Sequence, residues 1–513
     1  MSHELTGLQF PLQPQTQKAS SSKTGREIIS AALKAVDQTS AEAAHQEKNW
    51  RKQYPKHFKA LVEHGIPSPK AALKIAEAGL AQVYESFDFY RDGYKLSVND
   101  MLQMHSQPLN TYRLQGSLEI EPTWYVPYRG EKLQGQALFN QIDLWETKGI
   151  IEPSHAEALR ECAVHPEWFD LSDRTMVLFG AASEAGPLTW LAQWKANIVA
   201  LDLPNERVWN KILNAILQGN ATLYAPSLTA IDPHASIRQL SETLGANLLT
   251  HTPEIAQWLL QFKQDLDLAA IAYLDGEKHV RVSVAMDSVM QYVSRHKSNT
   301  SLMYMCTPTD VYAVPNEILD AAEDKSLARS KLHRALSQGI ATVSAQHFFQ
   351  APTFKRIESG DRTYGVCDCL VVEQGPNYAL AKRIQQWRAT LARANGQRVS
   401  INIAPSTTTH SVTKNPLLKA AFNGARLFDV EAFAPETTNA LMAALWIYDL
   451  RHPRSVANPE VKLNHSLDLM MSGANHGGLW RVAYLARTAL PFAALYGFAE
   501  DKLPKSWMNK LTK

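Results

Sequence analysis

The stretch Met176-Val-Leu-Phe-Gly-Ala-Ala-Ser-Glu-Ala-Gly186 indicates how the centre of this chain of 513 residues folds. Its apolar start is typical of a buried strand, and the small residues that follow indicate a turn into a helix. A pyrophosphate group needs a close approach to the backbone and free N–H groups at a helix start, and small residues provide both. We therefore expect a strand at 176–179, a dinucleotide-binding turn, and a helix over 187–194.

An acidic residue ends the next expected strand, which covers residues 196–201. Asp202 lies 22 residues after Gly180, where a carboxylate accepts hydrogen bonds from a ribose diol and repels a 2′-phosphate. We therefore expect NAD as the cofactor, although Asn205 and Arg207 lie close enough to accommodate the phosphate of NADP. A turn without a ligand is the structural alternative. In this part of the chain the expected cofactor-binding residues are Gly180, Ala182, Ser183, Glu184, Gly186 and Asp202.

Apolar runs alternate with helical segments from about residue 173 onward, which is typical of a parallel sheet covered by helices. Residues 221–225 and 246–250 compete for the place of the third strand. The later expected strands are 268–274, 301–306, 366–372 and 399–403. We therefore predict the fold class α/β, with a doubly wound parallel sheet of Rossmann-like type and mostly α-helical additions at both ends of the chain.

Composition divides the remainder of the chain into regions. Residues 1–24 are polar and rich in Gln and Ser, so we expect them to be disordered. Apolar residues at helical spacing predict a mostly helical region over 25–170, with a small β element over 116–130. The expected Rossmann-like dinucleotide-binding domain covers 171–455, with a charged insertion at about 310–365, and a helical C-terminal region covers 456–513.

Bulk properties exclude several kinds of partner. The net charge of +2 provides no field that would attract nucleic acid. The four cysteines are too few and too scattered for a disulfide framework, which suits a reducing cytosol and predicts a cytoplasmic protein. Cys367-Asp-Cys369 lacks a second ligand pair at zinc-site spacing, so we expect no metal. No apolar run reaches the roughly 20 residues of a transmembrane helix. We expect a small-molecule substrate, and the sequence leaves a homo-oligomer open.

A tyrosine and a lysine stand four residues apart in Tyr378-Ala-Leu-Ala-Lys382, within an expected helix. Residues at this spacing share one helix face. A nearby ammonium lowers the pKa of a phenol from its reference of about 10 and favours proton transfer near neutral pH. The spacing also arises by chance in many helices, where it makes only a minor surface contact.

The order of these features resembles the short-chain dehydrogenase/reductase superfamily. A Gly-rich first turn, an acid after the second strand, the Tyr-x-x-x-Lys pair and Asn402-Ile-Ala-Pro405 at a strand end follow one another as in that family. The likeness covers about residues 173 to 455. The Gly-x-x-Ser-x-x-Gly turn is more similar to the atypical members than to the typical form.

The resemblance implies NAD(P)-dependent redox chemistry at a carbonyl or alcohol. Tyr378 would be the general acid/base, and Lys382 would hold the nicotinamide ribose and lower the pKa of the phenol. Pro405 and the run of hydroxyl residues after it would lie beside the nicotinamide. From that run, Thr407 and Thr409 are the expected cofactor-binding residues, with Thr409 or a neighbour bonding the carboxamide.

The chain departs from the family pattern at two catalytic positions. At the usual spacing of the family's serine, about a dozen residues before the tyrosine, stand Tyr364 and Gly365. Thr307 and Thr309 would take that role if residues 310–377 were an insertion. The asparagine of the family's proton relay has only Asp287 as a weak counterpart.

The large helical flanks suggest a bulky or apolar substrate enclosed by added walls. Two other functions stay open: an epimerase or dehydratase that retains NAD, and a non-catalytic protein that binds a partner through its flanks. The Gly-rich break at 473–478 is either a lid over the site or a turn between helices.

Overall fold

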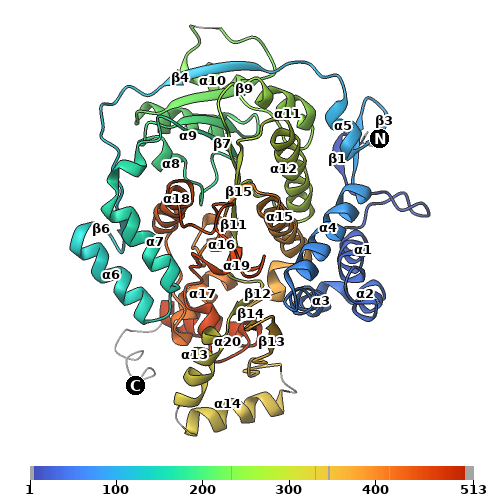
Figure 1. Cartoon of the computed structure of the whole chain (residues 1–513), viewed down its shortest axis with the longest axis vertical. Coiled ribbons are helices and arrows are strands. Elements are labelled where there is room, and N and C mark those ends of the chain that lie inside the picture. Colours follow the sequence, from blue (N-terminus) through green and yellow to red (C-terminus); the bar gives the residue numbers. More distant parts are fainter. Residues whose placement is uncertain (1–4, 233, 330, 345–346, 415, 503–513) are drawn as a thin grey trace.

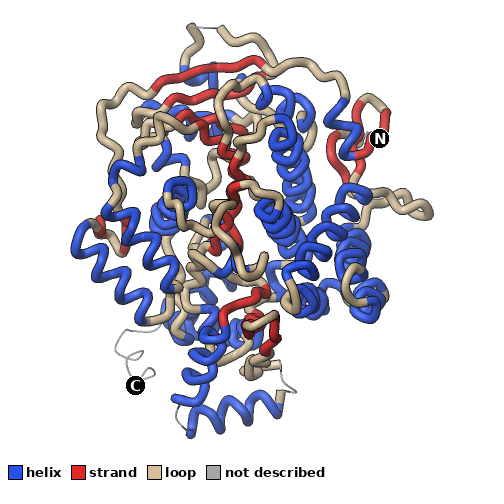
Figure 2. The backbone as a smooth tube through the Cα atoms, in the orientation of Figure 1, coloured by secondary structure: helices blue, strands red, loops and turns tan. Residues whose placement is uncertain are grey.

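A seven-stranded, mostly parallel sheet lies at the centre of the molecule, and helices cover it (Figures 1 and 2). The computed structural model describes residues 5–232, 234–329, 331–344, 347–414 and 416–502. The strands are, in spatial order, β15 (Arg398–Ile403), β11 (Ser301–Cys306), β10 (Asp267–Ala270), β7 (Thr175–Phe179), β8 (Asn197–Leu201), β9 (Thr222–Ser227) and β4 (Asn110–Gln115). Only β4 runs antiparallel to its neighbour. The chain is thus mixed α/β and compatible with a Rossmann-like fold.

The order of the strands reverses at β7. From β7 the chain continues to β8 and then β9 on one side, and it returns to β10 on the other side of β7. The carboxyl ends of these parallel strands lie at the same edge of the sheet. In α/β sheets, ligands commonly bind outside the carboxyl ends of the strands at such a reversal.

Both faces of the sheet are buried, which explains the continuous apolar runs of its strands. Side chains alternate between the faces of a strand. Val177 and Phe179 of β7 accordingly pack in one core cluster, and Met176 and Leu178 pack in another. The first cluster includes α12 (Glu277–His296) and α15 (Pro376–Ala394), and the second includes α18 (Pro435–Arg451), α7 (Pro153–Val164) and α9 (Glu206–Leu217). Figure 1 shows α12 and α15 on the right of the sheet and α18 and α7 on its left.

The structure decides between the two candidates for the third strand. β9 takes that place, whereas residues 246–250 form turns. The reason lies in Asn247, whose side chain accepts a hydrogen bond from the Leu249 N–H at 2.9 Å. The Asn247 carbonyl accepts another from the His251 N–H at 2.8 Å. Asparagine side chains commonly stabilise turns in this way.

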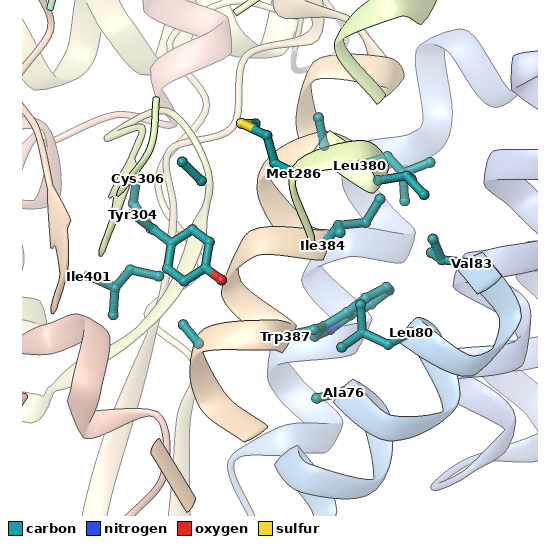
Figure 3. Packing of buried hydrophobic residues seen from close by; sticks show 14 of the residues in the cluster. Ala76, Leu80, Val83, Met286, Tyr304, Cys306, Leu380, Ile384, Trp387 and Ile401 are labelled. Atoms are coloured by element: carbon teal, nitrogen blue, oxygen red, sulfur yellow. The ribbon is translucent and has the colours of Figure 1, made fainter. Parts of the chain in front are cut away.

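Four helices of the N-terminal region pack beside α15. They are α1 (Ser21–Lys34), α2 (Gln38–His45), α3 (Trp50–Gly65) and α4 (Pro69–Ser86). One close approach is at Gly79 of α4, where a Cβ atom would lie 2.5 Å from Trp387 of α15. Figure 3 shows Trp387 and Ile384 facing Leu80 across this contact. The glycine therefore allows α4 to support the helix that carries Tyr378 and Lys382.

The expectation of disorder over residues 1–24 is wrong for the described part of that segment. Strand β1 (Gly7–Gln9) pairs antiparallel with β2 (Asp88–Arg91), which in turn pairs with β3 (Tyr94–Ser97). Leu8 is fully buried, and its carbonyl accepts a hydrogen bond from Arg281. The buried side chains of Leu8 and Phe10, together with backbone pairing, hold this polar segment in place. Residues 1–4 lie outside the described residues.

The β element of the N-terminal region also differs from the expectation of 116–130. The segment before it forms β4, which extends the main sheet, and only β5 (Val126–Tyr128) falls inside the expected range. β5 forms a hairpin with β6 (Glu131–Leu133). Residues 116–122 form no strand, and the N–H groups of Gly116 and Leu118 donate instead to the carbonyls of Ala221 and Gly219.

The expected insertion forms a small unit with its own antiparallel sheet, in the order β12 (Val311–Pro315), β14 (Arg362–Asp368), β13 (Arg356–Ser359). β14 begins before the strand expected at 366–372. Two helices, α13 (Asn316–Ala328) and α14 (Lys331–Val343), belong to this unit, and α14 lies at the lower end of the molecule in Figure 1. The remaining α-helices are α5 (Val98–Gln103), α6 (Gly135–Thr147), α8 (Leu188–Leu191), α10 (Ile237–Thr243), α11 (Thr252–Leu260), α16 (His410–Thr413), α17 (Pro416–Gly424), α19 (Asp468–Met471) and α20 (Ala486–Lys502). Among the helices of the described ranges, none has both the length and the apolar character to cross a bilayer.

A buried ion pair joins α12, α15 and α4. Asp287 accepts two hydrogen bonds from Arg388, at 2.7 and 2.8 Å, and a third from the Tyr84 hydroxyl at 2.8 Å. The Asp287 side chain is 4% exposed. These bonds use both carboxylate oxygens within the core. Asp287 is therefore a structural residue and not a member of a proton relay, which corrects its assignment as a counterpart of the family's asparagine.

We predict that Asp287→Ala lowers the free energy of unfolding by about 3 to 5 kcal/mol, because it leaves the Arg388 charge buried and uncompensated. Urea denaturation measures the change. Asp143→Ala is the control, since Asp143 pairs with Arg160 at a site where its own side chain is 62% exposed. Its loss should change the stability by less than about 1 kcal/mol. Equal effects of the two substitutions would contradict the structural role of Asp287.

Candidate functional site

Tyr378 and Lys382 lie in the first turns of α15. The helix follows Gly375, whose φ is +82°, and begins at Pro376, a residue suited to the first helical position. The Lys382 ammonium lies 5.9 Å from the centroid of the Tyr378 ring. Lys382 donates hydrogen bonds to the Met305 carbonyl at 3.0 Å and to Gln385 at 3.3 Å. The lysine thus connects α15 to the carboxyl end of β11.

Thr307 and Thr309 follow β11 directly, and the structure brings this segment beside Tyr378. The two threonine hydroxyls lie 2.9 Å apart, and Thr309 donates to the Gln374 side chain at 2.7 Å. The Thr307 hydroxyl also acts on the Tyr378 phenol, whose pKa it lowers. Tyr364, at the family's usual serine spacing, instead donates to Asp468 from β14.

Asp310 holds this segment against α15. Arg383 donates to one carboxylate oxygen of Asp310 at 2.9 Å, and Gln386 donates to the other at 3.0 Å. Asp310 is fully buried, and Arg383 is 6% exposed. Because Asp310 is adjacent to Thr309 in the chain, the pair positions both threonine hydroxyls near the phenol.

The acid–base properties of the pair differ from the expectation. Burial raises the pKa of Tyr378 to about 12, and the Thr307 hydroxyl only partly opposes this shift. Burial also lowers the pKa of Lys382. The expected lowering of the phenol's pKa by the ammonium is therefore wrong, since burial disfavours the phenolate and Lys382 is not among the groups that shift this pKa. At neutral pH the phenol is protonated and can donate a proton.

Two residues of the site, Tyr273 and His279, were missed by the sequence analysis. The His279 ring stacks on the Tyr378 ring, with centroids 5.4 Å apart and an interplanar angle of 21°. The Tyr273 ring lies 4.7 Å from His279 and 6.2 Å from Tyr378. Tyr273 and His279 both follow the carboxyl end of β10. That position, in an α/β chain where functional side chains gather at strand ends, was the available signal.

The turn after β7 packs tightly against the segment after β10. Gly180 has a φ of +89°, and a Cβ atom there would lie 2.5 Å from the Cα of Ala272. The N–H groups of Gly180 and Ala181 donate to the Leu201 carbonyl, and that of Ser183 donates to the Gly180 carbonyl. The turn therefore lies at the point where the strand order reverses, next to the segment that carries His279.

Asp202 lies beside this turn, at the end of β8. One carboxylate oxygen accepts from the Ala182 N–H and the other from the Leu203 N–H, both at 2.9 Å. Burial raises the pKa of Asp202. Lys211 donates to the Ala182 carbonyl at 2.8 Å, which places a cation at the same turn. The side-chain oxygen of Asn205 caps α9, because it accepts hydrogen bonds from the N–H groups of Arg207 and Val208. This oxygen therefore has a structural role.

The segment after β15 covers the turn. Glu184 accepts hydrogen bonds from the His410 N–H through its carboxylate and from Asn439 through its carbonyl, each at 2.9 Å. Thr407 bonds the Pro405 carbonyl at 2.9 Å and the Thr438 hydroxyl at 2.8 Å. These contacts fix the run after Pro405 between the turn and α18.

One expected element at the turn is incomplete. The helix expected over 187–194 is α8, which has four residues (Leu188–Leu191). Such a short helix provides little of the dipole that usually favours a pyrophosphate. Gly186 remains at the turn's end, where a Cβ atom would lie 3.0 Å from the flexible Ile271 side chain.

The Gly-rich segment at 473–478 is a packed loop and not a lid. Asn475 donates its N–H to the Ile403 carbonyl at 2.9 Å, and His476 pairs with Glu152 at 2.7 Å. Asn475 and His476 are fully buried. Within the described residues, no group of three or more His, Cys, Asp or Glu side chains is placed to hold a metal ion.

A scan against models of known protein families finds no match for this chain, and a search of the curated proteins finds none either. The likeness to short-chain dehydrogenases/reductases therefore rests on the residues described above.

We predict that His279 makes the protein less stable in acid. Burial lowers the pKa of His279 well below its usual value, and the Lys382 charge adds to the shift. The folded state thus keeps the ring neutral, whereas the unfolded state binds a proton below about pH 6.5. The free energy of unfolding should fall as the pH drops below that value, by at most about 1.4 kcal/mol per pH unit from this group.

Urea denaturation between about pH 7 and pH 5 tests this effect. His279→Phe should make the pH dependence shallower than in the wild type. Val280→Ala, at the next position of α12, should lower the stability equally at each pH, because it removes packing and no titrating group. A slope unchanged in His279→Phe would contradict the buried, neutral histidine.

Proposed function

We propose that this protein is an NAD(P)-dependent oxidoreductase of short-chain dehydrogenase/reductase type, built on a doubly wound sheet, that acts on a carbonyl or alcohol. The observation that carries the proposal is the grouping of Tyr378, Lys382 and Thr307 at the carboxyl ends of parallel strands. This group adjoins the strand-order reversal, where Gly180 and Asp202 stand. In α/β sheets this is the usual place for a ligand.

The residues at the reversal fit a dinucleotide at its two riboses. Asp202 would accept hydrogen bonds from the adenosine ribose in addition to those of the turn, and Lys382 would hold the nicotinamide ribose. The turn from Gly180 to Gly186, with small residues at all positions but Glu184, would lie against the pyrophosphate. Pro405 and the threonines after it would lie along the nicotinamide. When bound, the cofactor supplies the hydride, and the protein supplies binding and orientation.

The proton chemistry follows from the burial of Tyr378. Its raised pKa of about 12 keeps the phenol protonated at neutral pH, so it can give its proton to the substrate oxygen as a carbonyl becomes an alcohol. The Thr307 hydroxyl would hold the same oxygen. A proton from solvent then restores the phenol. This arrangement favours reduction near neutral pH.

A non-catalytic binding protein of the same fold is the second candidate. Two observations favour it: α8 has only four residues, and the N–H groups of Gly180, Ala181, Ala182 and Ser183 have partners within the protein. A protein that no longer binds a nucleotide would need neither a longer helix nor unpaired N–H groups at this turn. The two candidates differ in nucleotide affinity.

We predict that the protein binds NADH, and that it binds NADPH more weakly because the Asp202 carboxylate repels the 2′-phosphate. Isothermal titration calorimetry with each nucleotide measures both affinities. Asp202→Asn keeps the side chain's size and should narrow the difference between the two. An affinity for neither nucleotide would reject the proposed oxidoreductase and favour the non-catalytic protein.

We predict that Tyr378→Phe lowers turnover by about 10² to 10⁴-fold, because the phenol no longer donates a proton. Turnover is followed by the loss of NADH absorbance with a panel of apolar ketones and aldehydes. The affinity for NADH should change little. Tyr94→Phe is the control, since Tyr94 is 73% exposed. Turnover that is equal in both variants would exclude Tyr378 as the proton donor.

A further inference from the structure

His279 is a buried histidine whose hydrogen-bonding groups have no use within the folded chain. His279 is 2% exposed, and neither of its ring nitrogens has a hydrogen-bond partner among the described residues. Buried polar groups in proteins are usually paired, because an unpaired one loses its bonds to water without replacement. An imidazole with both nitrogens unpaired therefore needs an explanation.

The surroundings of His279 point to a ligand. One face of the His279 ring stacks on the Tyr378 ring, and the centroid of the Tyr273 ring lies 4.7 Å from that of His279. The Lys382 ammonium lies close enough to help lower the pKa of the imidazole. His279 thus shares its environment with the two residues that would contact the nicotinamide half of the cofactor.

We propose that His279 binds the ribose of the nicotinamide half of the dinucleotide, so that its two ring nitrogens gain partners when the cofactor enters. This inference rests on the proposed function. A neutral imidazole has one N–H donor and one nitrogen acceptor. A vicinal diol offers both an acceptor oxygen and a donor O–H. The chemical match is therefore to an uncharged diol rather than to a phosphate, which offers no donor when ionised.

Tyr273 covers His279 from the solvent side. Its ring is 48% exposed, and its hydroxyl donates to Asp275 at 3.1 Å, within the same loop. The loop ends at Gly276, whose φ is +62°. A Cβ atom added to this glycine would have no other atom within 4 Å. A ligand that binds His279 must therefore displace the half-exposed Tyr273 ring.

Binding experiments with three nucleotides distinguish contacts to the adenosine ribose from contacts to the second ribose. ADP contains the adenosine ribose alone, whereas ADP-ribose and NADH also contain the second ribose. We expect His279→Phe to weaken the binding of NADH and ADP-ribose by about tenfold, as for one or two lost hydrogen bonds. The binding of ADP should not change. Calorimetric titration of the purified full chain measures all three affinities without any turnover.

Two further variants control this experiment. His279→Asn keeps a donor and an acceptor and should lose less affinity for ADP-ribose than the phenylalanine variant. His296→Phe changes an exposed histidine at the other end of α12 and should alter none of the affinities. Thermal unfolding verifies that each variant is folded.

The outcomes distinguish this inference from the proposed function. If the wild type binds NADH and ADP-ribose, and His279→Phe binds them equally well, the role of His279 is wrong and the proposed function stands. If the substitution weakens the binding of ADP by the same factor as the binding of ADP-ribose, the lost contact is not to the second ribose, and the inference also fails. If the wild type binds none of the three nucleotides, the proposed function itself fails, together with this inference.

Discussion

The buried ion pair between Asp310 and Arg383 is the contact on which the geometry of the candidate site depends. Asp310 belongs to the segment that leaves β11, and Arg383 follows Lys382 on α15. Removing one partner of such a pair leaves the other charge buried and uncompensated, so the helix has one favourable position against the strand end. The Thr307 hydroxyl and the Tyr378 phenol meet for this reason, although the whole small antiparallel unit separates them in the chain.

The N-terminal helices support the same helix from its other side. Arg388, one and a half turns after Arg383, pairs with Asp287 of α12, and Tyr84 of α4 completes that contact. Gly79 brings α4 close to Trp387. A region in which no catalytic motif is found thus helps to determine where Tyr378 is held. Its function is structural, and the added helices need not enclose a substrate to explain their presence.

The sequence predicts those parts of the molecule whose structure is determined locally. Strands such as β7 and β8 follow from nearly continuous apolar runs, since burial on both faces favours apolar residues. Their order, and the position of Thr307, depend on contacts between distant segments. Residues 246–250 look like a strand, but the turn at Asn247 prevents pairing. The placement of Tyr378 and Lys382 side by side is predictable from the sequence, because their helical spacing fixes a common face. His279 and the raised pKa of Tyr378 are not predictable, because both arise from burial by other elements.

The contact between Gly180 and Ala272 connects the two halves of the site. A Cβ atom on Gly180 would lie 2.5 Å from the Cα of Ala272, so the backbones of the two segments are in direct contact. Ala272 precedes Tyr273 in the loop that leads to His279. A displacement of the turn after β7 must therefore move that loop or be opposed by it. Since Asp202 is hydrogen-bonded to the Ala182 N–H, a molecule that engages Asp202 also acts on this turn. These contacts connect the turn beside Asp202, through backbone packing, to the loop that carries the rings beside Tyr378.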